Sequence, residues 1–139
     1  MNTVVPAFEQ ILENVGLLVA RGQMPSGGGW TGTPGASTFN RYGVIHPLKG
    51  PTDGPANLPD QIIAQRIQVT VVGATASSTE FYAEQVRLAL VGQRISTATR
   101  TTLRPIWLDE FGEVDRDDTV KPSVFMVPHI FGVTTTPAS

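Results

Sequence analysis

The chain has 139 residues, a net charge of −2 and no cysteine, so it has the size of one domain and can form neither a disulfide nor a cysteine nucleophile. No cluster of Lys and Arg is present, which argues against a protein that grips nucleic acid electrostatically. Because the sequence has no signal-peptide pattern and no apolar run of roughly 20 residues, we expect a soluble protein that is made in the cytoplasm and has no membrane partner.

An amphipathic helix is the first predicted element. Apolar residues recur at spacings of three and four over 4–19, with Pro6 in the first turn, where its missing amide is harmless. Arg21 and Gly22 offer a favourable charge and a left-handed residue at its end. We therefore predict that this helix ends at Arg21 and Gly22.

A Gly/Pro/Ser/Thr-rich loop is predicted next, over residues 22–37. It contains a glycine run that resembles a phosphate-binding loop in composition but lacks the Gly-Lys-Ser/Thr ending and the strand-to-helix context. We interpret this run as a candidate inter-subunit loop that is costly to order alone and becomes ordered against a neighbour. The residues concerned are Gly27, Gly28, Gly29 and Trp30.

A strand is predicted over Thr38–Leu48, followed by a second loop, rich in Pro and Gly, over residues 49–60. The next strand, Ile62–Val72, has the clearest pattern in the chain. Ile67, Val69 and Val71 alternate with polar residues, which is the period of a half-buried strand.

A second helix is predicted over Ser78–Val91. Ser77 and Glu80 have the Ser-x-x-Glu spacing of a capping box, and Gly92 offers a stop. Val86 lies on the apolar stripe of this helix and should share one core with Val69 of the preceding strand.

Two strands complete the prediction, over Thr101–Leu108 and over Val120–Thr134, the latter bent or bulged around Pro128 and Gly132. The order is α-β-β-α-β-β. It predicts an α+β fold with a mainly antiparallel or mixed four-stranded sheet and two helices on one face. We expect one domain over residues 1–139.

An acidic loop is predicted over residues 109–118, because half of the acidic residues of the chain fall there. Its members are Asp109, Glu110, Glu113, Asp115, Asp117 and Asp118. They could bind a hard cation, although the run departs from the Asp-x-Asp-x-Asp-Gly pattern of calcium loops, and a solvated turn is the commoner meaning. In a ring, repeated loops of this kind would form a negative surface that repels DNA.

The two histidines, His46 and His129, have no acid or second histidine at a spacing that indicates a metal site or a catalytic triad. We interpret both as ordinary strand residues with satisfied ring nitrogens. No catalytic residue, metal ligand or cofactor is predicted, and we do not expect an enzyme.

The first helix, the alternating strand of the Arg-x-Gln-Val type and the helix containing residues 81–90 together resemble tail terminator proteins of long-tailed bacteriophages, particularly phages of actinobacteria. The resemblance spans mainly Val4–Arg21 and Gln61–Leu108. It implies a homohexameric ring in the virion, at the tail-neck junction, that assembles in the host cytoplasm. Its implied partners are the tail tube protein and the stopper or head-completion protein, and DNA passes through the lumen without specific binding.

Two other functions remain open from the sequence. One is another neck or tail ring protein, such as a stopper or a tube subunit. The other is a metal-dependent phosphate-processing enzyme that uses the acidic residues of 109–118.

Overall fold

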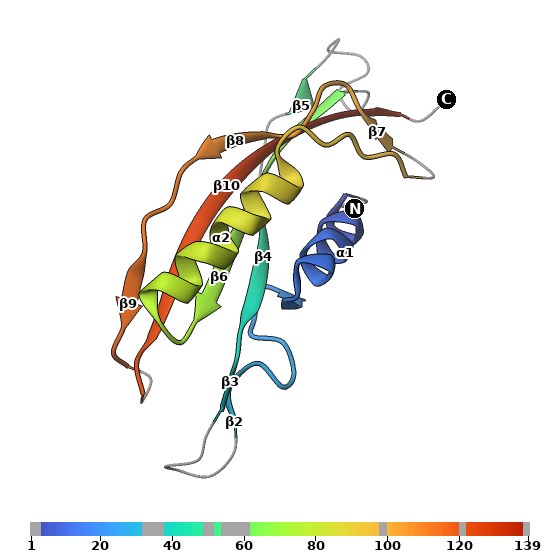
Figure 1. Cartoon of the computed structure of the whole chain (residues 1–139). Helices are drawn as coiled ribbons and strands as arrows, with labels where there is room; N and C mark the ends of the chain where they lie inside the picture. The colour runs from blue at the N-terminus through green and yellow to red at the C-terminus, as the bar shows by residue number, and fades with distance from the viewer. Residues whose placement is uncertain are drawn as a thin grey trace.

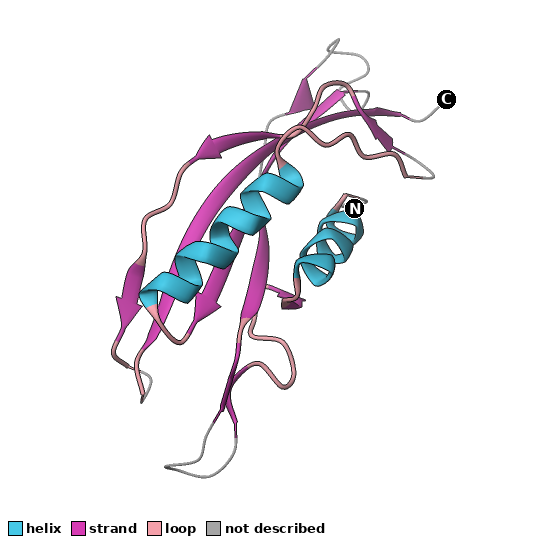
Figure 2. Cartoon of the chain, viewed as in Figure 1, coloured by secondary structure: helices cyan, strands magenta, loops and turns pink. Residues whose placement is uncertain are grey.

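The computed structural model describes residues 4–31, 38–48, 52–53, 62–97, 100–119 and 122–137. Within these ranges, two helices lie on one face of a strand-rich mixed sheet (Figure 1), which confirms the predicted α+β class. Figure 2, coloured by secondary structure, shows the strands of the sheet in magenta and the two helices in cyan. No helix in these ranges is both long enough and apolar enough to span a bilayer.

The centre of the sheet is an antiparallel pair, β6 (Ile62–Gly73) and β10 (Val124–Pro137), with an unbroken register from Phe125 opposite Gly73 to Thr135 opposite Ile63. The other edge of β6 pairs with β4 (Tyr42–Leu48) and β5 (Thr52–Asp53), and β1 (Leu18–Arg21) lies parallel to β4. The other edge of β10 pairs with β7 (Arg100–Thr102), β8 (Trp107–Glu110) and β9 (Asp115–Asp117).

The core lies between this sheet and the helices α1 (Val5–Val15) and α2 (Ala76–Leu90). The alternation predicted for β6 is confirmed, because Ile67, Val69 and Val71 are all buried in the core. Phe8 and Leu12 of α1 and Val86 and Leu90 of α2 are buried in the same cluster. Val69 and Val86 therefore lie in one core, as predicted.

The first helix is shorter than predicted. It ends at Val15, because Gly16 adopts a left-handed φ of 104° and its amide donates to the carbonyls of Glu13 and Leu12. Residues 18–21 then form β1, hydrogen-bonded in parallel to β4, instead of the last helical turn. The apolar residues of this stretch suit a strand as well as a helix, and pairing with β4 decides between them.

The second helix begins two residues earlier than predicted, and the predicted capping residue is wrong. Thr75 has an extended backbone, and its Oγ1 accepts a hydrogen bond of 3.1 Å from the amide of Ser78, so Thr75 and not Ser77 caps α2. At the other end, Gly92 has a positive φ of 88° just beyond the helix, as expected of a stop.

The sheet contains more strands than the four predicted. The stretch 38–48 is divided at Arg41 into β3 (Thr38–Asn40) and β4, and 101–108 is divided between β7 and β8. The expected irregularity of β10 is a register shift between Ile130 and Phe131, confined to its pairing with β8. The predicted acidic loop is also partly strand, because it contains the end of β8 and all of β9.

A two-stranded ribbon forms outside the main sheet, from β2 (Gly29–Thr31) and β3. Figure 1 shows the ribbon projecting from the end of β4, away from both helices. The predicted loop 22–37 therefore contains a strand. Of the predicted loop 49–60, only residues 52–53 lie within the described ranges, and they form β5.

Candidate functional site

An open groove of about 530 Å³ lies between the N-terminal half of α2 and the connection from β8 to β9, with β10 beneath it. It is lined by Glu80, Ala83 and Glu84 of α2, by Phe111, Gly112, Glu113 and Val114 of the connection, and by Val127 and His129 of β10. Three segments that are distant in sequence therefore build one surface with an apolar floor and carboxylates among its lining residues.

Gly112 holds the connection against β10. Its amide donates a 2.9 Å hydrogen bond to Nδ1 of His129, and the Phe111 ring lies 4.9 Å from the imidazole, centroid to centroid. A Cβ on Gly112 would lie 1.5 Å from the carbonyl oxygen of Pro128, so only glycine allows this close approach. The backbone of the connection therefore forms a fixed wall of the groove.

His129 is a buried neutral histidine at the base of this wall. Its side chain is only 2% exposed, and burial lowers its pKa, with Glu84 acting in the opposite direction and Arg87 acting in the same direction. Because Nδ1 accepts from Gly112, the neutral ring carries its proton on Nε2. The expected satisfied nitrogen is thus confirmed for Nδ1. The Gly112–His129 hydrogen bond fixes the connection against β10.

We expect acid to weaken the fold through His129. A lowered folded-state pKa means that the unfolded chain binds the proton more readily, so stability is full above about pH 6.5 and falls as the pH drops below that value towards the folded-state pKa. Urea titrations at successive pH values should show this loss in the free energy of unfolding. The His129→Asn variant keeps an acceptor but cannot titrate, and it should lose this part of the pH dependence; an unchanged pH profile would contradict the assignment.

The predicted acidic residues are not brought together into one site. Nε of Arg66 lies 2.8 Å from Oδ2 of Asp109, and the same guanidinium lies 3.4 Å from Oε2 of Glu110. Of the six acids, Glu113 is the one that lines the groove. The part of the chain that the structure describes contains no group of three or more acidic or histidine side chains placed to hold a metal ion.

The acids of β9 and the following turn are engaged locally. Asp117 accepts hydrogen bonds from the hydroxyl and amide of Thr119, which lower its pKa. The pKa of Asp118 is lowered by the hydroxyl of Ser123 and by Arg116, whose Nε lies 2.6 Å from the carboxylate. Oδ1 of Asp115 accepts from the amide of Arg116. These contacts hold Thr119 and Ser123 beside the acids, which remain exposed or half-exposed on the surface.

The glycine run lies at the base of the ribbon. Gly27 and Gly29 both have left-handed φ angles, of 81° and 82°, and Gly29 is the first residue of β2. The Trp30 ring packs edge-on against Phe39 at a centroid distance of 5.1 Å, and its Nε1 donates a 3.0 Å hydrogen bond to the carbonyl of Pro122. Trp30 is therefore held by contacts within its own chain. That residues 27–30 become ordered only against a neighbour stays a prediction.

The groove residues of α2 were missed by the sequence analysis. Glu80 and Glu84 are four residues apart and so share a helix face, a signal that was visible in the sequence. No pattern in the sequence indicated that Phe111 and Val114 would lie across from them.

Comparison with known proteins adds no relative: no protein-family model matches the sequence, and no curated protein matches it. The fold and the groove together describe an α+β protein whose surface groove is lined by apolar and acidic residues.

Proposed function

We propose that this protein is a tail terminator of a long-tailed bacteriophage, a ring protein that caps the tail tube and joins it to the neck. The proposal rests on the sequence resemblance and is supported by the surface of the subunit. Large apolar side chains remain exposed on a domain whose core is already complete: Phe81, Leu88, Leu103 and Phe111. Exposed apolar side chains are available for contact with neighbouring subunits, and this observation supports the proposal.

The ribbon of β2 and β3 is a second supporting feature. It stands beyond the end of the main sheet (Figure 1), where it is available to an adjacent ring. In a homohexamer each subunit would present one ribbon, so the ring would carry six around its axis, facing the tube or the stopper. DNA would pass through the middle, and the acids of 109–118 would repel its phosphates wherever they border the lumen.

No observation favours the metal-dependent enzyme. Five of the six acids in 109–118 contact arginines, hydroxyls or amides, and the described acids do not converge on one point. Another neck or tail ring protein would share the same surface features. The position of the ring on the tube distinguishes a terminator from a tube subunit.

Tube growth provides the test of the proposal. Purified protein added to growing tubes of the tube protein from the same phage should stop elongation and appear as a ring on one tube end. Electron microscopy would measure tube length and the fraction of capped ends, with bovine serum albumin at equal concentration as the control. Tubes that elongate unchanged would contradict a terminator, and incorporation along the whole tube would indicate a tube subunit.

A further inference from the structure

The rim and floor of the groove define what it can accept. Phe111 is 68% exposed, and Val114 is exposed beside it, while Ala83 and Val127 form a buried apolar floor. Glu84 is paired with Arg87 on its own helix. Glu80 and Glu113, in contrast, form no ion pair with another described residue. The groove therefore suits an apolar side chain flanked by cationic groups.

An apolar side chain flanked by cationic groups lies beyond the C-terminal end of α2. Leu103 is 47% exposed, and its backbone is held on both sides: its amide donates to the carbonyl of Thr134 at 2.9 Å, and its own carbonyl accepts from Nη1 of Arg94 at 3.3 Å. Arg104 follows directly in the chain. The backbone that carries this apolar side chain is thus held in place next to two arginines.

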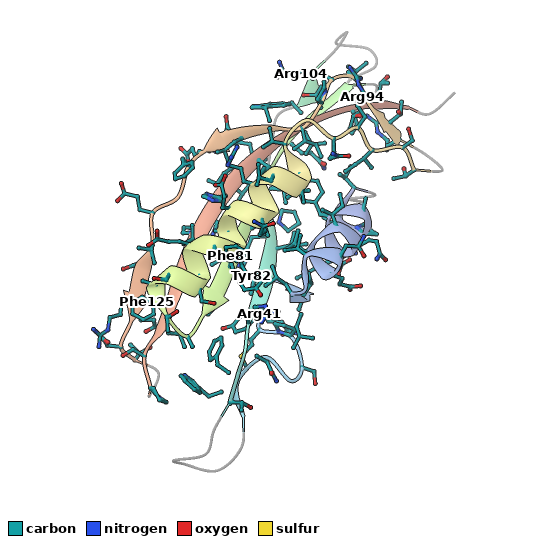
Figure 3. The ribbon with its side chains drawn as sticks, in the orientation of Figure 1. Arg41, Phe81, Tyr82, Arg94, Arg104 and Phe125 are labelled. Carbon is teal, nitrogen blue, oxygen red and sulfur yellow. The ribbon has the colours of Figure 1, made fainter. Side chains whose placement is uncertain are left out.

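The two arginines form no ion pair with a described carboxylate. The guanidinium carbon of Arg104 lies 3.8 Å from the centroid of the Trp107 ring, which fixes its position without neutralising its charge. Figure 3 shows Arg94 and Arg104 together at the end of the molecule that lies opposite Phe125. We call Arg94, Leu103 and Arg104 the basic knob.

We propose that the basic knob of one subunit inserts into the groove of a second copy of the same chain, with Leu103 against the apolar floor and the arginines near Glu80 and Glu113. The two surfaces are different patches of one molecule, so the contact is head-to-tail and repeats from subunit to subunit. A head-to-tail contact closes into a ring when its rotation allows. The inference rests on the proposed ring function and assigns the contact that would build the ring.

Apolar burial of Leu103 would supply affinity, and the unpaired charges would set the direction of docking. A knob facing another knob would bring arginines together, and a groove facing another groove would bring carboxylates together. The charges therefore disfavour a two-fold dimer through either surface and favour the alternation of knob and groove.

Disulfide trapping tests this contact cleanly, because the native chain has no cysteine. Equal amounts of Leu103→Cys and Val114→Cys proteins, mixed under mild oxidation, should form a covalent dimer that contains one of each. A specific contact should give a yield at least about tenfold above that of a matched control pair, Leu103→Cys with Glu13→Cys, because docking raises the local thiol concentration. The variant carrying both Leu103→Cys and Val114→Cys should form a ladder of dimers, trimers and larger species on a non-reducing gel.

Three results would overturn the inference. The first is a yield of cross-linked dimer no greater than that of the control pair. The second is efficient self-linking of either single-cysteine variant, which would indicate a two-fold contact, and the third is protection of the Val114→Cys thiol from alkylation only when tube protein is added. The tube-growth assay separates this inference from the proposed function. Trapping without tube capping would retain the contact and reject the terminator, whereas capped tubes whose rings cannot be trapped would retain the terminator and reject the contact.

Discussion

Replacing Val86 with aspartate should unfold the protein. Val86 and Val69 are both 0% exposed and lie in one core cluster, on α2 and β6. An unpaired carboxylate buried there costs several kcal/mol, which is comparable to the roughly 5–15 kcal/mol that stabilises an entire domain. Circular dichroism should show the loss of cooperative melting in the Val86→Asp protein, and Val69→Asp should behave in the same way.

The matched control for this prediction is Leu88→Asp. Leu88 lies two residues further along α2 but is 56% exposed, so its aspartate variant should melt near the wild-type temperature. The comparison holds the helix and the new side chain constant and changes only burial. Wild-type melting of Val86→Asp and Val69→Asp would show that the assigned core is wrong.

The second large effect is expected at Gly132. A Cβ at this position would lie 2.1 Å from two atoms of the Trp107 ring, which crosses over β10 at the point where Trp107 and Gly132 pair. The ring is rigid and already stacked by Arg104, so Gly132→Ala should displace the Trp107 ring and weaken the pairing of β8 with β10. We expect a loss of about 1–3 kcal/mol in the free energy of unfolding, measured by urea denaturation.

A double-mutant cycle identifies the cause of this loss. In a Trp107→Ala background the added methyl group meets no ring, so the cost of Gly132→Ala should largely disappear. The coupling between the two substitutions then measures the clash itself. Equal costs in both backgrounds would show that the alanine acts through the strand backbone and not through Trp107.

The sequence predicted elements best where a repeating pattern continued through an element. The alternation at Ile67, Val69 and Val71 located β6 and its buried face because a strand with one face in the core must repeat every two residues. The end of α1 was predicted wrongly because Gly16 and Gly22 are both plausible stops. The choice depends on hydrogen bonds between β1 and β4, which no local pattern contains.

The groove was beyond sequence analysis for a similar reason. Its wall depends on the amide of Gly112 reaching His129, a contact between residues 17 positions apart that requires β8 and β9 to lie along β10. The acidic run was correctly recognised as a concentration of charge, but its contacts could not be assigned. Arg66, which binds Asp109 and Glu110, comes from the far side of β10, and local spacing cannot reveal such a partner.

The position of β10 has a consequence for how the protein acquires its fold. This strand follows every other described strand along the chain, yet it is the partner of β6, β7, β8 and β9. A growing polypeptide can form its helices and the pairing of β4 with β6 early, but half of the sheet has nothing to bind until β10 leaves the ribosome. The pairing of β10 with β6 must then join segments separated by α2 and three strands. Until this slow step is complete, apolar surface and an unpaired strand edge stay exposed. Nascent chains halted before residue 124 should therefore depend on chaperones far more than released protein does.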